Sequence, residues 1–237
     1  MDVREKDSGL KTVIIGAGGL ACQVLDIVEA CNRSGNRHEI LGHIVESPWG
    51  EPGPLPNGLT VLGDFDWLDT YGEGVAGIVA VAAPETRFRL VQKAEEIGIH
   101  FCNIIHPAAI LPRRISMGEG GVLHAGAILS FQTRIGNHVV VNMNCAIGEN
   151  TVIEDFTTLS PGANICGDVT IGRGTFIGTG ATIIERVHIG EWSIIGAGAT
   201  IIDDVPPNTT VVGVPGKVIK TREAGWHRYG TVRWTIG

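Results

Sequence analysis

The sequence predicts a small α/β domain followed by a solenoid of six-residue repeats. Three observations carry this prediction. A glycine-rich turn follows an apolar strand near the N-terminus, strand and helix patterns alternate as far as about residue 100, and an aliphatic residue or Met then recurs at every sixth position. Alternation of strands and helices is typical of a mostly parallel sheet, and a fixed short period is typical of a solenoid.

Composition limits the classes of function. The 237 residues are 43% hydrophobic, which allows a buried core in one or two domains. A net charge of −7 without a dense basic run argues against a nucleic-acid or membrane surface as partner. No stretch approaches the ~20 apolar residues of a membrane span, and the N-terminus lacks the apolar core of a signal peptide. The five cysteines form no CxxC pair, which favours free thiols. We therefore expect a cytoplasmic protein.

The first part, residues 1–104, is expected to form a Rossmann-like domain with a small parallel sheet. An apolar strand is followed by a turn with Gly16, Gly18 and Gly19 and then by an amphipathic helix. The remaining expected elements are a strand at 39–46, a surface loop rich in Pro and Gly at 47–58, a strand at 60–65, a short helix at 66–71, a strand at 77–83, a helix at 84–98 and a strand at 100–105.

The glycine-rich turn is a candidate phosphate site, because backbone N–H groups at a helix N-terminus can approach an anion there. A nicotinamide site would place an acidic residue about 20 positions beyond the glycines. Glu46 lies 27 positions beyond Gly19, at a strand end, so the spacing makes NAD a weak prediction. The predicted substrate-binding residues are the three glycines, Glu46 and Ala82.

The second part, residues 105–220, is defined by its repeat. An unbroken run of this length has about one chance in a million at this composition. The repeated positions are Ile105, Leu111, Met117, Leu123, Leu129, Ile135, Val141, Ile147, Ile153, Leu159, Ile165, Ile171, Ile177, Ile183, Ile189, Ile195 and Ile201. Four positions after each of them the residue is almost always small or β-branched. One large and one small inward position per six residues is typical of a triangular prism, in which residues 18 apart stack at the ~4.8 Å strand spacing.

The order VIIGAGGLA, GHIVES, IVAVAA and IIHPAAIL before the repeats resembles the sugar acetyltransferases related to sialic acid O-acetyltransferase and to the N-acetyltransferases of nucleotide-linked 4-amino-4,6-dideoxy sugars. The resemblance covers almost the whole chain. It implies a left-handed parallel β-helix that binds acetyl-CoA, an N-terminal domain that binds the nucleotide-sugar, and a homotrimer whose active sites lie between subunits.

Two departures from this family bear on the chemistry. The family commonly has His in the glycine-rich turn, where this chain has Leu20, and it usually carries a catalytic His in a stretch that corresponds here to residues 148–153. Glu149 occupies the position of that His. A carboxylate there can accept the proton of the attacking amine, but Glu149 can equally be a solvated turn residue like Glu119, Glu185 and Glu191 in their own repeats.

Gly167 and His124 are the other candidates for catalysis. Gly167 stacks 18 residues beyond Glu149, and the resemblance implies that its N–H contacts the thioester carbonyl, although it can also be a plain turn glycine. His124 is the reserve candidate for the base. His106 and His124 lie 18 residues apart and are therefore expected to stack. Two ligands are fewer than the three or four that a metal site needs, so no metal site is expected. Cys145 occupies a small inward position and is expected to be core rather than nucleophile.

For the acetyl-CoA co-substrate, the predicted contacts are Gly178, Gly196 and Lys217, the last in a segment that resembles the family's terminal element. The tail, residues 221–237, is longer than the resemblance leads us to expect, and its Trp226, Tyr229 and Trp234 suggest packing on the prism or on a neighbouring subunit.

The leading prediction for function is an acetyl-CoA-dependent N-acetyltransferase acting on a nucleotide-linked 4-amino-4,6-dideoxy sugar. Two alternatives remain open: an O-acetyltransferase acting on a sugar hydroxyl, and a non-catalytic trimer that binds a nucleotide-sugar but lacks the family's base.

Overall fold

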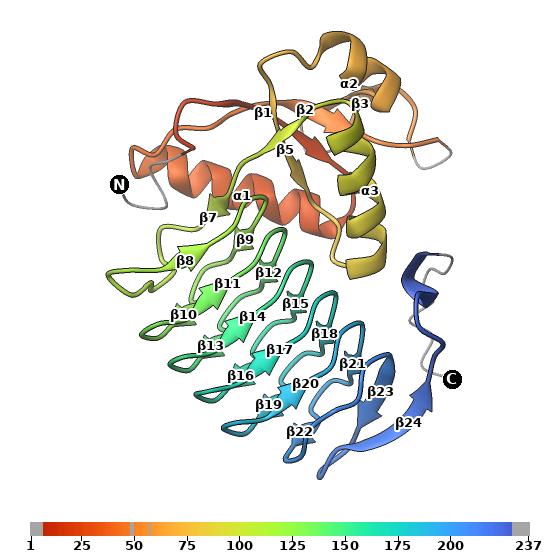
Figure 1. The fold of residues 1–237 in the computed structure, drawn as a ribbon. Coiled ribbons are helices and arrows are strands. Elements are labelled where there is room, and N and C mark those ends of the chain that lie inside the picture. Colours follow the sequence, from red (N-terminus) through yellow and green to blue (C-terminus); the bar gives the residue numbers. More distant parts are fainter. Residues whose placement is uncertain (1–6, 48–49, 57, 229–237) are drawn as a thin grey trace.

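The computed structural model describes residues 7–47, 50–56 and 58–228. Figure 1 shows an α/β domain lying across one side of a three-sided prism of short strands. After the last coil, the chain returns along the prism towards the α/β domain. This arrangement confirms the predicted order of a small α/β domain followed by a parallel β-helix.

The α/β domain is built on a six-stranded sheet with the order β3-β4-β2-β1-β5-β6. Its strands are β1 (Lys11–Ile15), β2 (Glu39–Ile44), β3 (Gly53–Pro54), β4 (Thr60–Gly63), β5 (Ala76–Val79) and β6 (His100–Phe101). All neighbours are parallel except β3, which pairs antiparallel with β4. The segment 47–58 was expected to be wholly irregular, so this two-residue strand is a small departure from the prediction.

Three helices accompany the sheet: α1 (Gly19–Arg33), α2 (Phe65–Tyr71) and α3 (Pro84–Glu96). α2 begins where Asp64 Oδ1 accepts a hydrogen bond from the Asp66 N–H, which satisfies one otherwise unpaired amide. α3 begins with Pro84 in its first turn, a position where the missing N–H costs nothing.

The prism has three parallel sheets, which we name by their position. The covered sheet lies under the α/β domain and contains β7 (Ile104–Ile105), β9 (Val122–Leu123), β12 (Val140–Val141), β15 (Thr158–Leu159), β18 (Phe176–Ile177), β21 (Ile194–Ile195), β23 (Thr209–Val212) and the antiparallel β24 (Lys217–Thr221). The first open sheet contains β10 (Ile128–Leu129), β13 (Ala146–Ile147), β16 (Asn164–Ile165), β19 (Thr182–Ile183) and β22 (Thr200–Ile201). The second open sheet contains β8 (Ser116–Met117), β11 (Arg134–Ile135), β14 (Val152–Ile153), β17 (Thr170–Ile171) and β20 (His188–Ile189).

The strand register confirms the predicted coil of 18 residues. Ile128 pairs with Ala146, and Ala146 pairs with Asn164. The residues repeated at every sixth position form one continuous core in the prism, with the small residues between them. Cys145 belongs to this core and is fully buried, as expected. The chain bends at three corners per coil: corner 1 leaves the covered sheet, corner 2 leaves the first open sheet, and corner 3 leaves the second open sheet.

The covered sheet and the α/β domain share a hydrophobic core. Val122 and Val140 point outward from the prism and pack in one cluster with Val24 and Ile27 of α1. Phe156, at corner 3, packs into the cluster that contains Leu90 of α3. The two parts are therefore joined by buried apolar surface and not only by the chain that connects them. β7 (Ile104–Ile105) spans the predicted domain boundary between residues 104 and 105.

Arg87 of α3 is the main polar link between the two parts. Its side chain is fully buried. Within the α/β domain it donates from Nη1 to the carbonyl oxygens of Val81 (2.6 Å) and Ala82 (3.1 Å). From the prism, its guanidinium binds His138 O (2.8 Å), Phe156 O (2.6 Å), Thr157 O (3.2 Å) and Thr158 Oγ1 (2.9 Å). Burial lowers the pKa of Arg87 to about 9 against the opposing effect of Glu85, so the group stays charged at neutral pH.

The described part of the tail packs against the prism and α3. His227, in the 3₁₀ turn η1 (Trp226–Arg228), stacks on Trp192 with ring centroids 3.7 Å apart. Phe88 of α3 meets the same His227 ring edge-on at 5.7 Å, and Arg222 lies over Trp226 at 4.7 Å. The expected contacts of Tyr229 and Trp234 lie outside the described residues.

Replacing Arg87 with Met should strongly destabilise the fold, because it leaves buried carbonyl oxygens of both parts without a donor. We expect the free energy of unfolding to fall by at least ~3 kcal/mol. Urea unfolding at one fixed protein concentration measures this change. Arg33→Met is the matched control, since Arg33 makes only an exposed ion pair with Glu29 and should cost less than ~1 kcal/mol. Equal shifts in the two variants would contradict the linking role of Arg87.

Candidate functional site

The glycine-rich turn lies between β1 and α1 and is open on one side. Gly16 has φ +114°, and a Cβ there would lie 3.2 Å from Ala80 O, so both backbone shape and space favour glycine. A Cβ at Gly18 or Gly19 would meet no atom within 4 Å. His43 Nδ1 donates to Gly16 O at 2.8 Å and so fixes the turn against β2. The turn therefore presents an unobstructed backbone at the start of α1.

A cleft of about 340 Å³ adjoins this turn at the carboxyl ends of the parallel strands. It is lined by Ile15, Gly16, Ala17, Gly18, Ile44, Val45, Glu46, Phe65, Val81, Thr86, Arg89 and Leu90. β1 lies between β2 and β5 in the sheet, so the chain order changes direction beside this cleft. Ligands of open α/β sheets commonly bind at such a position. The predicted residues Gly16, Gly18 and Glu46 thus come together in one cleft.

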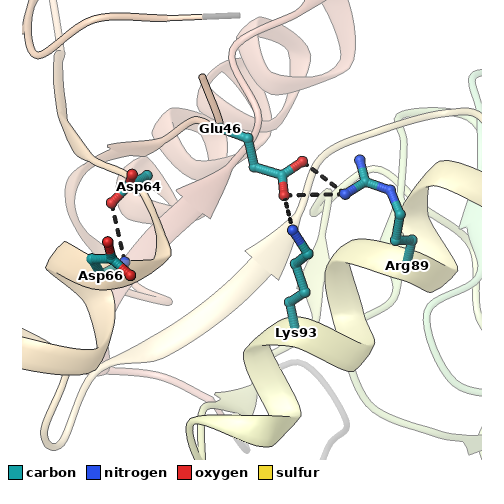
Figure 2. Close-up of polar contacts among 5 residues, drawn as sticks. All are labelled: Glu46, Asp64, Asp66, Arg89 and Lys93. Carbon is teal, nitrogen blue, oxygen red and sulfur yellow. Dashed lines mark hydrogen bonds and ion pairs between the residues drawn. The ribbon is translucent and has the colours of Figure 1, made fainter. Parts of the chain in front are cut away.

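Glu46 is held by two cations of α3. Arg89 Nη1 lies 2.8 Å from Glu46 Oε2 and 3.1 Å from Oε1, and Lys93 Nζ donates to Oε1. Figure 2 shows both side chains reaching from α3 to the carboxylate. Burial alone would raise the pKa of Glu46, but the hydrogen bonds and charges of Lys93 and Arg89 lower it overall. Glu46 is therefore an anion engaged by two cations of α3 rather than a free carboxylate.

Ala82 lies just beyond β5, next to this cleft. Its carbonyl oxygen accepts hydrogen bonds from Arg87 Nη1 and from Thr158 Oγ1 at 2.7 Å. The residue itself is exposed. The Ala82 carbonyl oxygen thus binds residues that link the α/β domain to the prism, and only the methyl group and N–H of Ala82 remain for a substrate.

Glu149 and Gly167 lie at corner 2, one coil apart, as the 18-residue period predicted. A Cβ at Gly167 would lie only 2.6 Å from Glu149 Oε1, so the carboxylate covers the face of this glycine. Within the described chain, the Gly167 N–H makes no hydrogen bond. Glu149 is exposed in the single chain. The corner thus places one unpaired N–H donor beside one carboxylate, which are the two groups that acyl transfer from a thioester can use.

His124 lies at corner 1, on another edge of the prism from Glu149. It is 3% exposed and its Nε2 is buried without a hydrogen-bond partner in the described chain. Burial, aided by the nearby His106, lowers the pKa of His124 to about 4. The ring is therefore neutral at neutral pH and a weak base. The structure does not bring the two candidate bases together.

The predicted co-substrate residues lie near the later coils. Gly178 and Gly196 occupy corner 1, where a Cβ would lie 2.5 Å from Ala197 N and 2.8 Å from Val212 Cγ1, respectively. Close packing of successive coils is by itself sufficient to require glycine at both positions. Lys217 begins β24 and is exposed, so its ammonium group is free to meet a phosphate.

Residues 7–47, 50–56 and 58–228 contain neither a metal-binding group nor a membrane-spanning helix. No group of three or more His, Cys, Asp or Glu side chains there is arranged to hold a metal ion. None of the helices in those ranges has the length and apolar character needed to cross a membrane.

Comparisons with known proteins agree with this architecture. Residues 168–203 match the bacterial transferase hexapeptide family (six repeats). No curated protein matches the sequence. Among solved structures, a mutant of perosamine N-acetyltransferase from Caulobacter crescentus, in complex with CoA and GDP-perosamine, is 29% identical with a TM-score of 0.82 and matches over 90% of this chain and 98% of that one.

Two other solved structures are similar to nearly the same extent. The acetyltransferase domain of PglB from Neisseria gonorrhoeae, in complex with acetyl coenzyme A, is 28% identical with a TM-score of 0.78 over 88% of this chain and 98% of that one. WeeI from Acinetobacter baumannii is 26% identical with a TM-score of 0.79 over 89% of this chain and all of that one (100%). The resemblance to hexapeptide-repeat sugar acetyltransferases, and with it the left-handed β-helix, is therefore confirmed over nearly the whole chain.

Proposed function

We propose that the protein is an acetyl-CoA-dependent N-acetyltransferase that acts on the amino group of a nucleotide-linked 4-amino-4,6-dideoxy sugar. The observation that carries this function is the match, over 90% of the chain, to an enzyme solved with CoA and GDP-perosamine. The cleft beside the glycine-rich turn suits the nucleotide end of such an acceptor, and the prism suits the acetyl donor. We also propose a cytoplasmic location for the protein.

The chemistry we assign to corner 2 requires few groups. The neutral amine attacks the thioester carbonyl carbon, and the Gly167 N–H stabilises the negative charge that develops on its oxygen. The carbon–sulfur bond then breaks, and CoA leaves as a thiolate that takes up a proton. The attacking nitrogen loses its proton to Glu149, directly or through one water. We assign Gly178, Gly196 and Lys217 to the co-substrate; because Gly178 and Gly196 lie at corner 1, we assign them to the CoA whose thioester lies at corner 2 of a neighbouring subunit.

An acetylation assay tests this function and separates it from the alternatives. Protein is mixed with acetyl-CoA and a panel of UDP-, dTDP- and GDP-linked 4-amino sugars, and free CoA and the product mass are followed. We expect CoA release with at least one amino sugar and no release with its 4-hydroxy counterpart. Transfer to the 4-hydroxy sugar would favour the O-acetyltransferase. Binding of sugar nucleotides without any CoA release would favour the non-catalytic protein.

Replacing Glu149 with Gln should lower kcat/KM by ~10²–10⁴, because the change preserves size but removes the base. The Kd for CoA should stay unchanged, since the carboxylate is assigned no role in donor binding. Glu185→Gln is the matched control, because Glu185 is exposed at the same corner one coil beyond Gly167. Glu149→His should remain active, as it restores the residue found in the resembling family.

Full activity of Glu149→Gln would show that the carboxylate is only a turn residue. His124→Asn is then the decisive variant, and a loss of activity there would transfer the role of base to His124. If neither change matters, the amine loses its proton to solvent, and alignment with the Gly167 N–H supplies the catalysis.

The protein should be a homotrimer in solution. Large apolar side chains stand exposed on the first open sheet and at corner 2: Ile110 at 59%, Ile128 at 45% and Phe131 at 66%. Phe131 lies one coil before Glu149 in the same column, so a neighbouring prism that covered it would also enclose the proposed base. Light scattering should give three times the chain mass of 25.1 kDa, and Phe131→Asp should lower the mass. A single-chain mass at micromolar concentration would contradict a shared site.

A further inference from the structure

Two cations of α3, Arg89 and Lys93, share one carboxylate, that of Glu46. The three groups together therefore keep one positive charge. Glu46 is the more buried member, with a side chain 19% exposed against 47% for Arg89 and 46% for Lys93. The anion thus lies beneath the cations, and the positive groups face solvent.

Arg89 pairs with Glu46 through only one of its three guanidinium nitrogens. Nη1 makes both contacts with Glu46, at 2.8 and 3.1 Å. Figure 2 shows the second terminal nitrogen directed away from the carboxylate. Nε and Nη2 have no hydrogen-bond partner in the described part of the chain. A planar edge with two free N–H donors matches the geometry of a phosphate group.

Other residues that line the cleft also suit a nucleotide. Arg89 and Gly18 line the same 340 Å³ cleft, and Gly18 leaves the backbone at the start of α1 uncovered. Phe65 and Leu90 provide an apolar surface in this cleft, on which a nucleobase can lie. Asp64, which is close in sequence to Phe65, is engaged by the N–H of Asp66 (Figure 2) and does not compete for Arg89.

We propose that Arg89 binds the phosphate groups of the nucleotide-linked acceptor and that Glu46 is a positioning residue that aims it. The identity of the ligand as a sugar nucleotide rests on the proposed function. Glu46 acts through Arg89 in this assignment, because its carboxylate oxygens accept from Arg89 and Lys93. Specificity for a phosphorylated acceptor then comes from α3, and the turn supplies backbone donors on the other side.

Calorimetric titration of the full protein with GDP, UDP and dTDP, and with the matching nucleosides, tests this assignment. For the diphosphate that the parent binds most tightly, Arg89→Gln should raise Kd by about 10- to 100-fold, the loss of one or two charge-assisted hydrogen bonds. The Kd for the nucleoside should hardly change. Arg33→Gln is the matched control, because Arg33 pairs with Glu29 in the same domain away from the cleft. An unchanged Kd for the diphosphate in Arg89→Gln would overturn the proposal, as would a parent that binds none of the three.

Glu46→Gln separates positioning from simple charge. Removing the anion makes the cluster more positive, so binding of the diphosphate would become tighter if charge alone mattered. If Glu46 aims Arg89, the Kd should instead rise by several-fold. Tighter binding would overturn the positioning role.

Two further titrations identify the source of the phosphate. CoA carries phosphate groups too, so a rise in the Kd for CoA in Arg89→Gln, with that for nucleoside diphosphates unchanged, would move Arg89 to the donor site and overturn the proposal. Inorganic phosphate should bind too weakly to compete with the nucleotide. Failure of the proposed function is distinguishable: diphosphate binding that depends on Arg89, without acetyl transfer to any amino sugar, would uphold the subsite and reject the reaction.

Discussion

Arg87 is the constraint on which the arrangement of both parts depends. A fully buried guanidinium is costly unless its donors are paired, and here they bind carbonyl oxygens of the α/β domain and of prism corner 3. Val81 lines the cleft beside the glycine-rich turn, and its carbonyl oxygen accepts from Arg87. One side chain therefore sets the position of the cleft relative to the coils of the prism. The apolar cluster of α1 with Val122 and Val140 completes the joint.

A fixed joint matters because the proposed reaction joins an acceptor held by the α/β domain of one subunit and a donor at the prism of its neighbour, so each cleft must keep its position on its own prism. The nucleotide end of the acceptor is assigned to the cleft by Arg89, and the thioester is assigned to the prism at Gly167. Alignment of two reactants lowers a barrier only where the groups that hold them keep a constant separation. The α/β domain lies over the covered sheet, whereas corner 2 lies on the opposite edge of the prism. The cleft of a chain therefore does not face Glu149 of the same chain. A neighbouring subunit with its own cleft would supply the acceptor, which is why the trimer is central to the proposal.

Much of this structure is predictable from the sequence because the prism is periodic. The anchor residues define the core, and the 18-residue period correctly placed Glu149 over Gly167. The glycine-rich turn was equally readable, since Gly16 has a backbone conformation that favours glycine. Arg87 and Arg89 were missed, because both occur within an ordinary amphipathic helix pattern. Their roles depend on partners 51 to 71 and 43 positions away in the chain. For the same reason, the sequence could show that Glu46 ends a strand but not that two cations engage it.

The most direct measurement is a crystal structure of the protein with CoA and a nucleotide-linked 4-amino sugar that it acetylates. The account predicts the diphosphate beside Arg89 in the cleft of one subunit, and the amine within ~3 Å of a Glu149 carboxylate, or one water away, with the CoA sulfur near the Gly167 N–H. An amine placed beside His124, or a nucleotide bound outside the cleft, would contradict it.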